Sequence, residues 1–121
     1  MNDKKGLIKQ KSFDFALRII KLYKFLNTEK REYVMSKQLL RSGTAVGALV
    51  RESQNAESKA DFIHKLAIAQ KECDETIYWL ELLFKSDFLD KSQFESINSD
   101  ANVILKMIRS AILTTKKTHN L

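Results

Sequence analysis

Apolar side chains recur every three or four residues along most of the stretch from Ser36 to Phe84, and this spacing is the strongest constraint on the fold. An α-helix completes a turn in 3.6 residues, so positions at alternating spacings of three and four share one face. The pattern therefore predicts two long helices, at residues 32–54 and 58–85, joined by a short polar turn. The repeating positions are Met35, Leu39, Ser42, Val46 and Leu49 in the first helix, and Phe62, Leu66, Ala69, Cys73, Thr76, Leu80 and Leu83 in the second.

The helix at 32–54 also carries a neighbouring face with almost no side-chain volume, formed by Gly43, Thr44, Gly47 and Ala48. A glycine inside a helix costs about 1 kcal/mol relative to alanine. Two such glycines need an offsetting gain, and the simplest one is a very close approach by another helix. We therefore expect a neighbouring helix to pack tightly on this face.

Two further helices are predicted at residues 12–27 and 91–115. Ser12 and Ser58 are suitable amino-terminal caps for the helices that follow them, and Ser58 is followed three residues later by Asp61. Residues 1–11 are expected to form a frayed basic arm, and residues 116–121 a basic tail. Because loops of three to five residues force antiparallel neighbours, we predict a single-domain, all-α, up-down-up-down antiparallel four-helix bundle.

The helix at 12–27 has two apolar rows on nearly opposite sides, although a monomeric bundle needs only one. One row contains Phe13, Ala16, Leu17, Ile20 and Tyr23. We predict that the other row packs against another chain, and the alternative is a wide contact within the core of one chain. The candidate interface residues are Phe15, Ile19, Leu22 and Leu26.

The net charge of +6 is unevenly distributed along the chain. Residues 1–31 carry +6 and residues 101–121 carry +4, whereas residues 52–100 carry −6. This asymmetry suits either an anionic partner on the basic surface or contact between oppositely charged faces of neighbouring subunits. Since lysines dominate and no base-reading motif is present, binding to RNA or DNA would be nonspecific and salt-sensitive. The candidate residues for phosphate contacts are Lys9, Lys11, Arg18, Lys21, Lys24, Lys30, Arg31, Lys116 and Lys117.

Residues for catalysis or for binding a metal ion are not grouped in this sequence. A di-iron centre in a four-helix bundle needs a Glu-x-x-His pair on each of two helices, and only Asp61 to His64 resembles one. Cys73 is the single cysteine and cannot form an intramolecular disulfide. No phosphate-binding loop or activated nucleophile is recognisable. We therefore expect a cytoplasmic protein that is not an enzyme, has no metal or cofactor, and does not span a membrane.

Charged side chains on the two central helices are candidates for a polar network. Glu72 and Glu75 share a helical face, and their repulsion would be relieved by a base such as Arg41 or Arg51 on the antiparallel helix. Glu52, which directly follows Arg51, is the fifth candidate for this network. The alternative is a solvated acidic face.

The chain resembles the four-helix bundle proteins encoded in intervening sequences of bacterial large-subunit ribosomal RNA genes. The resemblance covers nearly the whole chain and begins with Phe13 and Ala16. It is densest in residues 38–52, and it continues through residues 54–62 and through separate positions between Lys65 and Leu80.

This resemblance implies a bundle that can assemble into a ring of five subunits. A related group of bundles is similar to the accessory subunits of diversity-generating retroelements, which use a basic ring surface to engage a reverse transcriptase and nucleic acid. Together these similarities imply a bacterial, non-catalytic homo-oligomer that binds RNA or DNA. The alternative is a protein-interaction scaffold, or an accessory subunit for a protein encoded nearby, that does not bind nucleic acid directly.

Overall fold

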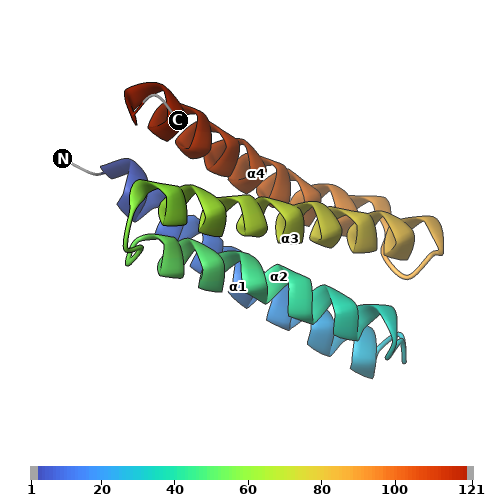
Figure 1. The fold of residues 1–121 in the computed structure, drawn as a ribbon. Coiled ribbons are helices and arrows are strands. Elements are labelled where there is room, and N and C mark those ends of the chain that lie inside the picture. The colour runs from blue at the N-terminus through green and yellow to red at the C-terminus, as the bar shows by residue number, and fades with distance from the viewer. Residues whose placement is uncertain (1–2, 120–121) are drawn as a thin grey trace.

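The computed structural model describes residues 3–119, and within this range the chain forms four helices (Figure 1). They are α1 (Asp3–Thr28), α2 (Met35–Ser53), α3 (Lys59–Lys85) and α4 (Lys91–His119). Each helix packs against the one before it, and α1 also packs against α4. The predicted all-α, up-down-up-down four-helix bundle is confirmed.

Helix α1 begins at Asp3, nine residues before the predicted start at Ser12. The expectation of a frayed arm was wrong for residues 3–11, because Ile8 is buried in the core and anchors this segment. The Lys5 carbonyl also accepts a 2.8 Å hydrogen bond from Gln54 Nε2. Ser12 is therefore not a cap but lies buried inside α1, where its hydroxyl donates to the Lys9 carbonyl at 3.1 Å.

The other end of the chain is also more helical than the sequence suggested. Helix α4 continues past residue 115 to His119, so most of the predicted tail is helical. Residues 1–2 and 120–121, which the sequence assigned to the arm and the tail, lie outside the described range.

The apolar row of α1 that was predicted to face another chain lies in the core of this chain. Phe15, Ile19 and Leu26 are at most 1% exposed within a single chain, and Leu22 packs against the same core. The prediction that this row faces another chain was therefore wrong, and the alternative of a core contact applies. The periodicity could not decide between the rows, because both are apolar and lie on opposite sides of the helix. The expected core row instead leaves Phe13 46% and Leu17 50% exposed.

Helix α1 packs closely on the small-residue face of α2, as the two glycines predicted. Gly43 lies against the Ile19 side chain, and a β-carbon at Gly47 would lie 3.0 Å from the backbone oxygen of Ser12. This close approach explains both the glycines in α2 and the inward direction of the Ile19 row.

Helix α2 begins at Met35 rather than at Glu32, and its N-cap residue, Val34, makes no side-chain cap bond. The Glu32 side chain takes over that capping role. The buried Glu32 carboxylate accepts backbone N–H bonds from Val34 at 3.1 Å, Met35 at 2.9 Å and Ser36 at 2.7 Å. These are among the amides that a helix leaves without internal partners at its first turn. Arg31, just before the cap, has a left-handed φ of 52°, which reverses the chain after α1.

Helix α3 has the predicted cap. The Ser58 hydroxyl accepts the Asp61 backbone N–H at 3.0 Å, while the Asp61 carboxylate accepts the Glu57 N–H at 3.2 Å. The predicted stripe of α3 is buried from Leu66 to Leu83 and forms the centre of the core with α2 and α4.

Candidate functional site

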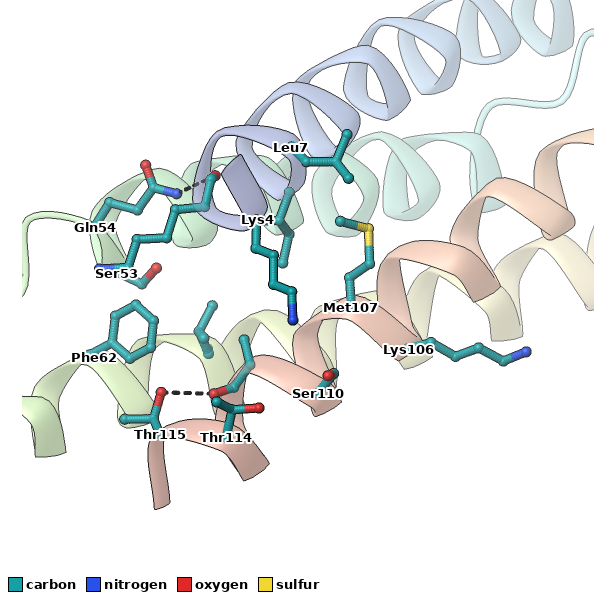
Figure 2. Close-up of a pocket in the computed structure, with 14 residues that line it drawn as sticks. Lys4, Leu7, Ser53, Gln54, Phe62, Lys106, Met107, Ser110, Thr114 and Thr115 are labelled. Carbon is teal, nitrogen blue, oxygen red and sulfur yellow. Dashed lines mark hydrogen bonds between the residues drawn. The ribbon is translucent and has the colours of Figure 1, made fainter. Parts of the chain in front are cut away.

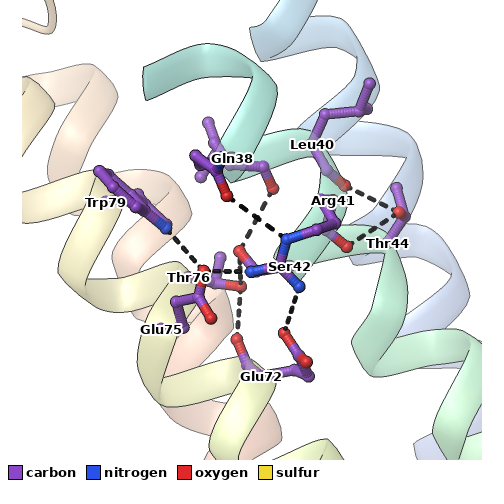
Figure 3. A network of polar contacts seen from close by, with 10 residues as sticks. Gln38, Leu40, Arg41, Ser42, Thr44, Glu72, Glu75, Thr76 and Trp79 are labelled. Carbon is purple, nitrogen blue, oxygen red and sulfur yellow. Dashed lines mark hydrogen bonds and ion pairs between the residues drawn. The ribbon is translucent and has the colours of Figure 1, made fainter. Parts of the chain in front are cut away.

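A polar network joins α2 to α3 and is centred on Arg41 (Figure 3). The Arg41 guanidinium donates to Glu72 at 3.1 Å and to Glu75, and its Nε lies 3.4 Å from the Gln38 side-chain oxygen. Trp79 Nε1 donates to the same Glu75 carboxylate at 2.9 Å. The structure thus brings together three of the five predicted network residues.

The ionisation of this cluster follows from its hydrogen bonds. Bonds from Trp79 and Arg41 hold the pKa of Glu75 below its usual value, because both donors stabilise the carboxylate. The contacts with Glu75 and Glu72 in turn raise the pKa of Arg41. The side chains of Arg41 and Glu75 remain 50% and 37% exposed, so this is a rim cluster that water screens.

The network extends from the surface into the core through two hydroxyls. Thr76 Oγ1 lies 2.7 Å from the Glu72 carbonyl and 2.9 Å from Ser42 Oγ. A hydroxyl has one proton, so when Thr76 donates to the carbonyl it accepts from Ser42. Both residues are fully buried, and both occupied positions of the apolar stripes. The sequence carries no signal for this pairing, because the helical periodicity marks each of them only as a core position.

Arg51 and Glu52 do not join this network. The Arg51 guanidinium lies 5.8 Å from the centre of the exposed Phe13 ring on α1, and Glu52 pairs with Lys65 at 3.4 Å. Arg51 therefore belongs to the α1–α2 surface, and Glu52 to the α2–α3 surface nearer the 54–58 turn.

Eight of the nine predicted phosphate-binding residues are exposed, and the ninth, Arg18, is half-buried. Arg18 is occupied by α4: it lies 2.7 Å from an Asp100 carboxylate oxygen and 3.0 Å from the Ser96 hydroxyl. The other eight candidates form no ion pair within residues 3–119. They are Lys9, Lys11, Lys21, Lys24, Lys30, Arg31, Lys116 and Lys117.

The solvent side of α1 combines exposed lysines with exposed apolar side chains. At 100° per residue, Lys9, Phe13, Leu17, Lys21 and Lys24 lie within one broad sector of the helix. We call these five residues the outer face of α1. The apolar pair lies at its centre, and lysines lie toward both ends.

Other kinds of site find little support in the described part of the chain. Across residues 3–119, no three side chains of histidine, cysteine, aspartate or glutamate gather closely enough to hold a metal ion. None of the described helices has the length and apolar character that a membrane crossing requires. Cys73 is fully buried, and burial raises the pKa of its thiol to about 12.

Comparison with known proteins identifies a family and a similar solved structure. Residues 4–110 match the family described as 23S rRNA-intervening sequence protein. A crystal structure of a protein with unknown function, from the S23 ribosomal protein family of Bacteroides thetaiotaomicron, is 54% identical to this chain. The match covers 90% of this chain and 97% of that one, with a TM-score of 0.89. No curated protein matches the sequence. The chain therefore belongs to the 23S rRNA-intervening sequence protein family.

Proposed function

We propose that the protein is a non-catalytic homo-oligomer that binds RNA or DNA phosphates nonspecifically through repeated copies of the outer face of α1. The observation that carries this proposal is the exposure of Lys9, Lys21 and Lys24 without an ion pair inside the described chain. Ammonium groups in this state can exchange their counterions for phosphates.

Self-association supplies the affinity that one subunit lacks. Phe13 and Leu17 expose apolar surface at the centre of the outer face, and contacts between subunits commonly have an apolar centre with a charged rim. The lysines toward the ends of this face would then stay accessible after assembly. A ring, with five subunits as the family resemblance implies, would multiply one weak basic patch and bind through avidity.

The experiment combines mass and nucleic-acid binding. Light scattering after size exclusion, with the absorbance ratio at 260 and 280 nm, is expected to show an oligomer that carries nucleic acid at low salt and releases it at high salt. Fluorescence anisotropy with labelled single-stranded RNA then tests the surface. Lys21→Glu/Lys24→Glu should weaken binding and flatten its salt dependence by about one unit of log slope per lost phosphate contact.

A matched control separates this surface from net charge alone. Lys71→Glu/Lys91→Glu makes the same charge change at exposed positions of α3 and α4. Equal affinities for the two double variants would show that the outer face of α1 has no special role. A monomer without nucleic acid at both salt concentrations would remove the avidity on which the proposal depends.

A protein-interaction scaffold is the second candidate, and the outer surface of α3 favours it. Tyr78 is 53% exposed there, and the exposed Glu81 lies close by on the same helix. This acidic, aromatic surface complements the basic, apolar outer face of α1 on a neighbouring copy or on another protein. An oligomer that dissociates in high salt and never carries nucleic acid would favour this function over the first.

A further inference from the structure

A cleft of about 490 Å³ opens at the end of the bundle where α1 begins and α4 ends (Figure 2). Its volume lies within the range of small-molecule sites, roughly 300–1,000 Å³. All four helices contribute lining residues, with α2 represented by Ser53 at its end, and the apolar side chains come from α1, α3 and α4. They include Leu7 and Ile8 of α1, Phe62 and Leu66 of α3, and Met107 and Ala111 of α4.

The polar side chains of the cleft are lysines, neutral hydroxyls and one amide, that of Gln54. Lys4, Lys5 and Lys106 are the charged residues at its edge, and no carboxylate side chain lines it. Figure 2 shows the Lys4 side chain extending from α1 across the cleft toward Ser110 and Thr114 of α4.

Lys4 and Lys5 differ in what they contact. Lys5 Nζ lies 5.3 Å from the centre of the Phe62 ring, a cation–π contact within the cleft wall. Lys4 forms no ion pair within the described residues. Lys106 also forms no ion pair within residues 3–119. Figure 2 shows the Lys106 side chain directed away from the other lining residues, so Lys4 is the unpaired ammonium that lies above the apolar surface.

We propose that this cleft binds a medium-chain fatty acid, with its carboxylate on Lys4 and its aliphatic chain along Leu7, Leu66 and Met107. One cation that reaches across the cleft matches a ligand with one negative charge, and the apolar walls match an unbranched hydrocarbon. The site lies on a different side of α1 from the outer face, so it goes beyond the proposed binding of nucleic acid. Each methylene that becomes fully buried would tighten binding up to about fourfold.

The methionine methyl groups provide a direct test with an internal control. Met107 lines the cleft, whereas Met35 begins α2 at the opposite end of that helix from the cleft residue Ser53. In protein labelled with ¹³C at the methionine methyls, sodium decanoate is expected to shift the Met107 resonance saturably and leave Met35 unchanged. Octanoate should bind more weakly than decanoate. Equal shifts at both methionines, or a shift that never saturates, would overturn the proposal.

Two kinds of variant separate the carboxylate contact from the apolar contact. Lys4→Gln should weaken decanoate binding up to about fivefold, as expected for an exposed ion pair, and leave decan-1-ol binding unchanged. Lys11→Gln, which removes an exposed lysine of the same helix outside the cleft, is the control. Unchanged decanoate affinity in Lys4→Gln would exclude the proposed headgroup contact.

Ala111→Phe is expected to fill the cleft and abolish binding of both ligands. If this variant loses helical circular dichroism, Leu7→Asp serves instead, because Leu7 is already 49% exposed and tolerates a polar side chain. If a second copy of the chain covers the cleft, Ala111→Phe would dissociate the oligomer while the wild type fails to bind decanoate, and that result would overturn the fatty-acid assignment.

Discussion

A β-carbon placed on Gly43 of α2 would lie 2.7 Å from Cγ1 of Ile19 on α1, a separation that real β-carbons essentially never show. Gly43→Ala should therefore destabilise the protein by about 1–3 kcal/mol, the usual cost of overpacking a core. This loss should outweigh the gain in helix propensity of about 1 kcal/mol. Urea unfolding followed by circular dichroism measures the difference.

Gly6 provides the control for that substitution. A β-carbon at Gly6 meets nothing within 4 Å, so Gly6→Ala should stabilise α1 by up to about 1 kcal/mol. Truncating the neighbour as well, in Gly43→Ala/Ile19→Val, should recover part of the loss. A Gly43→Ala protein as stable as Gly6→Ala would show that α1 and α2 are not in close contact there.

Substitution on the exposed side of α1 should affect self-association, and substitution on its buried side should affect stability. Leu17→Glu is expected to prevent self-association while changing the free energy of unfolding by no more than about 0.5 kcal/mol, since Leu17 is half-exposed. Phe15→Ala should cost about 3–5 kcal/mol, because Phe15 is 1% exposed. Light scattering and urea unfolding of both variants test the assignment. An oligomer that survives Leu17→Glu would place the subunit contact elsewhere.

The side chain of Glu32 should be worth more to stability than its place before the helix suggests. Glu32→Ala removes the acceptor for three backbone N–H groups, and we expect a loss of about 0.5–2 kcal/mol, as for other helix caps. Amide hydrogen exchange at residues 34–36 should also become faster. Glu29→Ala, at an exposed position in the turn directly after α1, is the control.

Glu75 should make a small, pH-dependent contribution to stability. Its pKa is lower in the folded protein than the ordinary value of 4.5, chiefly through the Trp79 bond and then Arg41. The stabilisation is therefore present above about pH 4.5 and is lost as the pH falls through the folded pKa. Glu75→Gln should be about 0.2–1 kcal/mol less stable than the wild type at pH 7, and the gap should close in acid. An equal gap at pH 7 and pH 3 would contradict this account.

The thiol of Cys73 should be unreactive while the protein is folded. Its pKa of about 12 leaves almost no thiolate at pH 8, and the side chain is fully buried beside the Ala101 carbonyl, 3.4 Å from Sγ. In urea, an aromatic disulfide reagent should modify the unfolded protein as fast as it modifies a free thiol. In the native protein, the rate of modification should be limited by the rate at which the structure opens and exposes Cys73. Rapid labelling without urea would show that α3 separates from α4 in the native state.

The local patterns predicted most of the fold, and contacts distant in sequence account for what they missed. The Ser58 cap and the stripe of α3 depend on residues within one helix, so the sequence was sufficient. The helical start of α1 depends on burial of Ile8 against other helices, which no local signal reports. The choice between its two rows depends on Gly43, 24 positions after Ile19.

The candidate sites also differ in how far the sequence could predict them. The Arg41 cluster followed from charge spacing on two antiparallel helices, because Glu72 and Glu75 share one face. Lys4 was assigned to a frayed arm, so its position across a cleft could not be foreseen. That cleft is lined by residues of all four helices and exists only after they pack together.

The cap on α2 also bears on the order in which the bundle forms. The Glu32 N–H bonds to the Leu26 carbonyl at 2.9 Å, and the Ser36 hydroxyl donates to the Glu32 carbonyl at 2.8 Å. These bonds span a few residues, so closing the turn sacrifices little chain entropy. Because contacts close in sequence form fastest, we expect the α1–α2 hairpin to be largely structured in the folding transition state. During synthesis, the α1–α2 hairpin could therefore form before α4 leaves the ribosome and provide the surface on which the later helices pack.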